Sequence, residues 1–124
     1  GLTNSTTQDG DVAITVSGGT EANVAQLNKI GSLTSGTVTA SITGNAADLD
    51  DLTTASTDAI TVTVSDAATV AQFNTINAAT SANVVLTGGL TDEAVNFSAT
   101  NGTATSGLTN STTQDGDVAI TVSG

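Results

Sequence analysis

The sequence has no cysteine, proline, histidine, methionine, tryptophan or tyrosine, and its only aromatic residues are Phe73 and Phe97. Without histidine or cysteine, and with a single lysine, no general base stands out that would activate a serine as a nucleophile. Without cysteine there are no disulfides. Large side chains normally supply the buried area of a globular core, so a core here must be thin and built from Val, Ile, Leu and Ala. These absences predict that the protein is not an enzyme.

Positive charge is almost absent as well. Lys29 is the only cation, and the formal net charge is -11. Nucleic acid is excluded as a partner because its binding requires Lys and Arg to displace counterions, and anionic membrane surfaces are excluded for the same reason. No apolar run approaches the length of a membrane-spanning helix. Divalent cations are therefore the natural small partners of this chain.

What the sequence does contain is a long repeat. Residues 1–18 read GLTNSTTQDGDVAITVSG, and residues 107–124 repeat those 18 residues without a difference, at an offset of 106. Such an identity does not arise by chance and indicates a tandem repeat. We expect 1–106 to be one full repeat unit of about four coils, 107–124 to begin the next identical repeat, and the chain to be a window from a longer array. An artificial duplication is the alternative interpretation of the identity.

Inside the repeat, four segments alternate apolar and polar residues, which is the pattern of half-buried strands. They are 12–16, 38–42, 60–64 and, more weakly, 82–86. The last apolar residue of each segment follows the previous one after 26, 22 and 22 residues. The inward side chains expected from the alternation are Ile14, Ala40, Val62 and Val84, with Val16, Ile42, Val64 and Leu86 beside them. The expected outward row is Thr15, Ser41, Thr63 and Val85.

A second pattern follows the first three strands. Apolar residues recur every third position over 24–30, 49–55 and 70–76, which places them on one face of a short helix. The expected N-caps are Thr20, Asn45 and Asp66. Two of the helical segments have similar sequences, VAQLNKI and VAQFNTI. We expect 94–99 to form an extra strand and 101–117 to be a long polar loop.

A strand and a short helix every 22–26 residues is the period of strand-plus-helix solenoids, and such crossovers make successive strands parallel. The expected fold class is mainly β with short helices, a tandem-repeat parallel solenoid. Tandem β-sandwich domains are the alternative, against which stand the missing proline, the missing core aromatics and the helical segments. Disorder is not expected despite the acidity, because the 37% of hydrophobic residues are arranged periodically.

Two segments of the sequence resemble those of a known family. TGNAADLDDLTTA and VSDAATVAQFNTINAATSANVVLTG resemble repeats of very large secreted surface proteins of cyanobacteria and other marine bacteria, the haemolysin-type calcium-binding or giant adhesin-like proteins. The resemblance covers roughly 12–92 and is carried by [ND]-A-A-x-x-x-x-[LF] after each strand. It implies secretion, a role at the cell surface or in a filament or biofilm matrix, and no catalytic residues. The calcium nonapeptide G-G-x-G-x-D of such proteins is absent here.

Acidic residues are the candidates for a site. Calcium prefers several carboxylate and carbonyl oxygens held in a turn, and Asp9, Asp11 and their copies Asp115 and Asp117 form short Asp-Gly-Asp turns. Asp48, Asp50 and Asp51 are the second candidate set for Ca2+. The alternative interpretation is structural, with Asp-Gly as a turn into a strand and Asp48 near the N-terminus of a helix. No other cofactor is indicated.

Two functions remain. The first is an extracellular structural repeat protein that builds a filament, sheath or surface-layer fibre, with adjacent repeats and neighbouring fibres as partners. The alternative is an adhesin module, with or without calcium, that binds a polysaccharide, ice or another surface through outward Thr residues such as those of Thr37-x-Thr39 and Thr61-x-Thr63. An adhesin is expected to concentrate exposed aromatics in a patch, and none is visible in the sequence, so the structural role is favoured.

Overall fold

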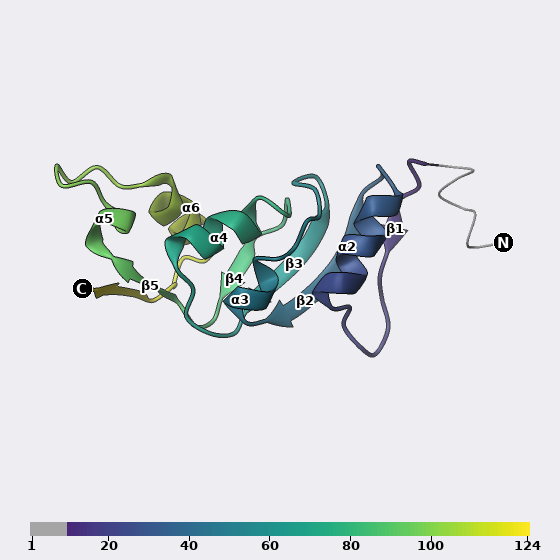
Figure 1. Cartoon of the computed structure of the whole chain (residues 1–124), viewed down its shortest axis with the longest axis horizontal. Helices are drawn as coiled ribbons and strands as arrows, with labels where there is room; N and C mark the ends of the chain where they lie inside the picture. Colours follow the sequence, from purple (N-terminus) through teal and green to yellow (C-terminus); the bar gives the residue numbers. More distant parts are fainter. Residues whose placement is uncertain (1–9) are drawn as a thin grey trace.

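The fold is an α/β arrangement, described by a computed structural model for residues 10–124. Four parallel strands form one sheet in chain order, and the chain advances along the long axis of the molecule (Figure 1). The strands are β1 (Ile14–Thr15), β2 (Val38–Gly44), β3 (Ala59–Val64) and β4 (Val84–Leu86). Within the described range, no helix has both the length and the apolar character needed to cross a membrane.

The prediction of four parallel neighbouring strands is confirmed, and antiparallel β-sandwich domains are excluded for the described part of the chain. The register differs from the expected one in part. Val62 pairs with Val84 as expected, but Ile14 pairs with Val38 and Ala40 with Ile60. A shift of two residues keeps every side chain on its face, so alternation alone cannot fix the register.

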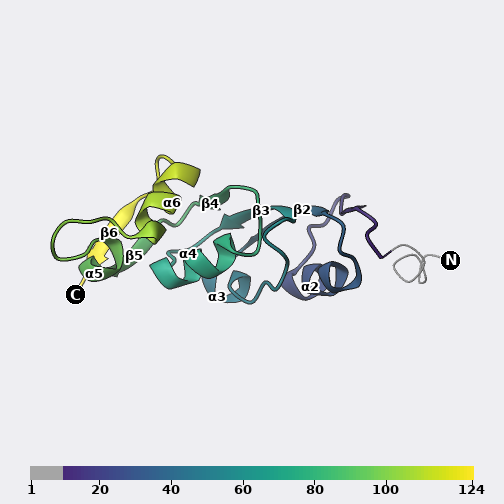
Figure 2. The same cartoon turned by 90° about the horizontal axis from the view of Figure 1, so that it is seen from above.

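Three helices follow the strands and lie on one face of the sheet (Figure 2). They are α2 (Val24–Leu33), α3 (Ala46–Leu49) and α4 (Val70–Asn77). Two match the predicted segments. The third, α3, overlaps the predicted 49–55 only at Leu49. It begins earlier because Asn45 caps it by accepting from the Asp48 N–H, and it ends at Leu49. The helices contribute fully buried side chains to the core, among them Leu27, Leu49, Phe73 and Ile76. Against them pack the inward residues of the sheet, among them Ile42, Val62, Val64, Val84 and Leu86.

Of the three expected N-caps, only Asn45 is confirmed. Thr20 and Asp66 are wrong: the caps are Asn23 and Thr69, three residues further on. Each accepts a hydrogen bond from the backbone N–H of the Gln three positions later, and that Gln side chain accepts from the N–H of the cap residue. This capping box satisfies two N–H groups at once. The Gln at the third position of the shared sequence VAQ is the feature that indicates the capping box.

The chain after β4 differs most from expectation. It forms β5 (Leu90–Glu93), α5 (Ala94–Phe97), α6 (Ser106–Gln114) and β6 (Ile120–Ser123). The expected strand over 94–99 is wrong because its first four residues are helical, which buries Phe97. The expected loop over 101–117 is wrong because most of it is α6. Strand β6 pairs in parallel with β5 in a second, two-stranded sheet.

Glycines allow successive strand–helix units to stack in backbone contact. A Cβ on Gly88 would lie 2.1 Å from the carbonyl carbon of Asp66 in the preceding unit. A Cβ on Gly36 would lie 2.3 Å from the carbonyl oxygen of Asp11. Real Cβ atoms do not approach backbone so closely, so both positions require glycine. The same device therefore sets the distance between units at two places in the stack.

Candidate functional site

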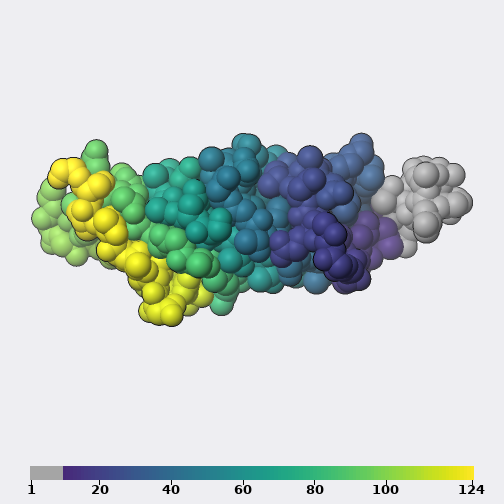
Figure 3. Space-filling model, turned by 90° about the horizontal axis from the view of Figure 1, so that it is seen from below, coloured from purple at the N-terminus to yellow at the C-terminus, as the bar shows by residue number. Residues whose placement is uncertain are grey.

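The second copy of the repeated segment, residues 107–124, is held against the part of the chain that precedes it. Figure 3 shows its yellow end as a strip on the surface beside the preceding segment. The Val84 N–H donates to Gln114 Oε1 at 2.9 Å, and the Leu86 N–H donates to Asp115 Oδ2 at 2.7 Å. The N–H of Leu90 donates to the Ala119 carbonyl at 2.9 Å. Because open strand edges invite pairing with other chains, the second copy covers edges of β4 and β5 that would otherwise be exposed.

Close packing holds α6 against α4. A Cβ on Gly107 would lie 2.4 Å from Val70 Cγ1, so the two helices meet where one of them has no side chain. Ser111 is fully buried, and Leu108 packs against the core. The Gln114 Nε2 also donates to Asn77 Oδ1 at 2.6 Å. Ser, Thr and Gly are weak helix formers, and this tertiary packing explains why the segment is nevertheless helical.

The second copy follows a rule that already operates between units of the repeat. A polar side chain of each unit hydrogen-bonds the first residues of the preceding strand segment. The pairs are Thr34 Oγ1 to the Val12 carbonyl, Val38 N–H to Asp58 Oδ1, Ile60 N–H to Thr80 Oγ1 and Val84 N–H to Gln114 Oε1. Gln114 thus stands where Thr34, Asp58 and Thr80 stand in their own units. The second copy therefore contacts the preceding part of the chain in the same way as each strand–helix unit contacts the one before it.

The two copies of the strand use opposite edges. In β1, the N–H groups of Ile14 and Val16 donate to the carbonyls of Thr37 and Thr39 in the following unit, at 3.0 and 2.8 Å. In the second copy, Ala119 is the equivalent of residue 13, and its carbonyl accepts from the preceding unit. Backbone groups of alternate strand residues point to opposite edges. The edge through which the first copy bonds is therefore not the edge through which the second copy bonds.

Asp115 and Asp117, two of the expected calcium ligands, lie together in the second copy. A hydrogen bond between their carboxyl groups, with the Leu86 N–H as a further donor, lowers the pKa of Asp115. The same hydrogen bond and the repulsion between the two charges raise the pKa of Asp117. Two oxygen-bearing groups so close can share a proton or a cation. In the first copy Asp11 is exposed, and Asp9 lies outside the described residues.

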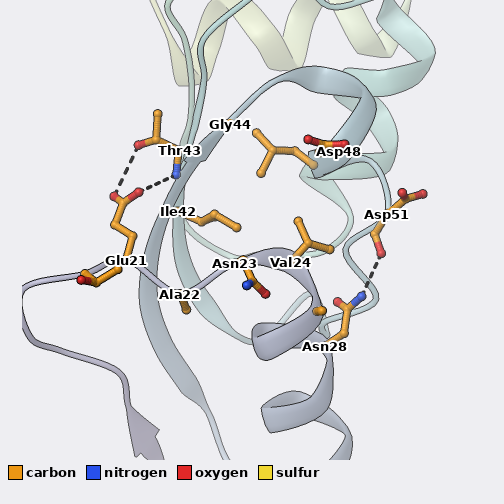
Figure 4. Close-up of a pocket in the computed structure, with 13 residues that line it drawn as sticks. Glu21, Ala22, Asn23, Val24, Asn28, Ile42, Thr43, Gly44, Asp48 and Asp51 are labelled. Carbon is orange, nitrogen blue, oxygen red and sulfur yellow. Dashed lines mark hydrogen bonds between the residues drawn. The ribbon is translucent and has the colours of Figure 1, made fainter.

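The second candidate set lies around α3. Asp48 is in its first turn and Asp50 is its C-cap residue. Asp48 and Asp51 line a groove of about 690 Å³ between α2 and α3, across from Glu21 (Figure 4). Glu21 accepts from the Thr43 N–H at 2.9 Å. Over residues 10–124, no three acidic side chains are grouped as metal ligands.

The carboxylates also have a structural role that was not predicted from the sequence. Besides Asp115, three of them accept backbone N–H groups of the preceding unit. The pairs are Val38 N–H to Asp58, Ala46 N–H to Asp66 and Val70 N–H to Asp92, at 2.9, 2.8 and 3.0 Å. At Asp92 a hydrogen bond from Asn96, assisted by the backbone N–H groups of Val70 and Glu93, lowers the pKa. The signal was spacing, since each acid follows its donor after 20 or 22 residues.

No protein-family model matches the chain, and no curated protein or solved structure matches it either.

Proposed function

We propose that the chain is a structural repeat module whose units stack as a continuous solenoid, building an extracellular filament, sheath or surface-layer fibre without catalysis. The observation that carries this proposal is the use of opposite edges by the two copies of the same strand. A strand with both edges committed joins one repeat to the next through the same ladder that joins units within a repeat. No separate interface is then needed between repeats.

Apolar exposure supports the same conclusion. Ile120 and Val122 are 37% and 60% exposed, whereas the equivalent residues of the first copy, Ile14 and Val16, are half-buried. Val16 packs against the core and borders one groove with α2 and the segment before it, which follow it in sequence. In an array, the α2 of the next repeat would border Val122 in the same way. Burial of that surface stabilises the junction by the hydrophobic effect.

Imaging of the native assembly tests the continuous array. With four strand layers per repeat at a spacing of about 4.8 Å, one repeat advances roughly 19 Å along a fibre axis. Helical reconstruction of native material should give that axial unit. Separate globular units of this size would instead recur at a distance on the order of 35–40 Å, and such a spacing would replace the continuous solenoid with beads on a string.

An extracellular location is supported by the resemblance of residues 12–92 to repeats of secreted surface proteins. Labelling of intact cells with an impermeant amine reagent is poorly suited to a chain with one lysine, so an antibody against the repeat is the better probe. Binding to intact cells is the expected result. Binding only after lysis would contradict the location and leave the stacking of units untouched.

Rows of hydroxyl groups favour the alternative, an adhesin that binds a polysaccharide, ice or another surface. On the outward face, Thr15 pairs with Thr39 and Ser41 with Thr61. These four side chains are exposed. Ala59 and Val85 interrupt the rows. Retention on immobilised polysaccharide that is lost in Thr39→Val/Thr61→Val, with the fold intact, would favour the adhesin over the passive fibre.

Calcium is proposed as the cation of the paired aspartates. A divalent ion at Asp115 and Asp117 would relieve the repulsion that raises the pKa of Asp117. It would also ease the self-repulsion of a chain with a net charge of -11. Calorimetry with calcium, and then with a chelator, is the test. An unchanged Tm would remove calcium from the proposed function.

A further inference from the structure

We propose that the seat of the second copy also accepts the first copy of another chain, so that two chains join head to tail by strand exchange. The seat consists of α4, β4 and β5, and its occupant here is residues 107–124. Residues 1–18 of a second chain carry the identical sequence. Every side-chain and backbone contact made by the occupant is therefore available to that partner. The inference rests on the proposed stacking of units and deepens it by naming the partner that fits the seat.

The first copy can serve as donor without giving up its own partner. In β1, the hydrogen bonds to β2 come from Ile14 and Val16. The backbone groups of Ala13 and Thr15 point to the other edge. In the second copy, this same edge is the one that pairs with β5, with Leu90 opposite Ile120 and Thr91 opposite Thr121. A chain can thus keep its four-stranded sheet and add its β1 to the β5 of a neighbour.

Mass action explains why exchange requires the internal copy to be disabled. The internal segment is tethered to its seat, with an effective concentration on the order of millimolar. A second chain at micromolar concentration competes poorly with it. Freeing the seat should reveal the intermolecular contact.

Two substitutions in the second copy of the full chain free the seat. Gly107→Val places a side chain against Val70, where even a Cβ would lie 2.4 Å from Cγ1. Thr121→Pro removes an N–H on the edge that faces β5. The same two substitutions in the first copy, Gly1→Val and Thr15→Pro, are the matched control, because Thr15 does not donate the hydrogen bonds from β1 to β2. A third protein carries all four substitutions.

The oligomeric state is measured by analytical ultracentrifugation over a range of concentrations. Gly107→Val/Thr121→Pro should form head-to-tail oligomers whose size rises with concentration. The wild type and Gly1→Val/Thr15→Pro should stay monomeric at the same concentrations. The protein with four substitutions should also stay monomeric, because neither of its copies can fill the seat. Equal association of the second-copy variant and the protein with four substitutions would indicate non-specific contact and overturn the proposal.

A peptide with the sequence of residues 107–124 gives an independent measurement. Added to Gly107→Val/Thr121→Pro, it should bind one peptide per chain, raise the Tm and dissolve the oligomers. A peptide with Val at its first position and Pro at its fifteenth should bind about tenfold more weakly or worse. No binding of the unaltered peptide, whether the variant is folded or partly unfolded, would overturn strand exchange. That result would not bear on a covalent array, which the axial unit of native fibres tests separately.

Discussion

Residues 11–18 and 117–124 are identical in sequence, and each contains a parallel strand, but their partners and their burial differ. The first copy pairs with the unit that follows it, through β2, and the second copy pairs with the unit that precedes it, through β5. Val16 packs against the core, whereas Val122 is 60% exposed. The same eight residues therefore have no fixed environment of their own. Their neighbours decide which edge is bonded and which side chains are buried.

The largest expected effect comes from the seat of the second copy. Leu90 is fully buried and lies in β5, directly beside β6. Leu90→Ala should lower the free energy of unfolding by about 2–5 kcal/mol, since it removes core contacts and leaves a cavity. Hydrogen exchange should then accelerate more at the amides of β6 than at the amides of Ile14 and Val16. Equal acceleration in both copies would mean that the two strands belong to one cooperative unit.

The next largest effect is expected from the hydrogen bond between the second copy and the edge of β4. Asp115→Ala leaves the Leu86 N–H without its side-chain acceptor, and we expect a loss of about 1 kcal/mol in chemical denaturation. Asp115→Asn keeps an oxygen at the same place and should recover most of this loss. If both variants are equally destabilised, the charge of Asp115 matters more than its role as an acceptor.

Shortening equivalent valines to alanine should destabilise the first copy more at one position and the second copy more at another. Val16 packs against the core and Val122 does not, so Val16→Ala should cost about 1 kcal/mol and Val122→Ala less than about 0.5 kcal/mol. Val118 also packs against the core, and Val118→Ala should cost more than Val12→Ala. Thermal unfolding of the four variants provides the measurement. A uniform loss would contradict the different environments of the two strands.

The smallest expected effect depends on pH. Because the folded state raises the pKa of Asp117, its contribution to stability is present at low pH and is lost as the pH rises through the raised pKa. Asp117→Asn removes this loss and should raise the Tm at pH 7, with a gain that shrinks as the pH falls toward 4.

At Asp92 the pH dependence of stability has the opposite sign. Its pKa is lowered, so its contribution persists at neutral pH and fades as the pH falls below the ordinary carboxyl range. Asp92→Asn should therefore lower the Tm at pH 7 and have less effect in acid.

Alternation of β-branched residues was sufficient to locate the four strands, since side chains of a strand alternate between faces. It left the register open, and the structure shifts β1 and β2 by two residues. The helix starts were displaced by three residues because Gln26 and Gln72 close capping boxes on Asn23 and Thr69. For the site, the Asp-Gly-Asp spacing places the carboxyl groups of Asp115 and Asp117 together, and the calcium expected there stays a prediction. The acceptor roles of Asp58 and Asp66 were missed because their donors lie 20 residues away in another unit, beyond the reach of local patterns.

The sequence by itself determined the parallel strands and the polar, acidic character, because these depend on local alternation and on composition. It also determined that residues 1–18 and 107–124 are identical. Only the tertiary structure decided that the two copies of this segment bond through opposite edges and that α6 is a helix. The physical reason is the same in both cases. A strand edge and a helix of Ser, Thr and Gly gain their stability from groups of a neighbouring unit, here Leu90 and Val70.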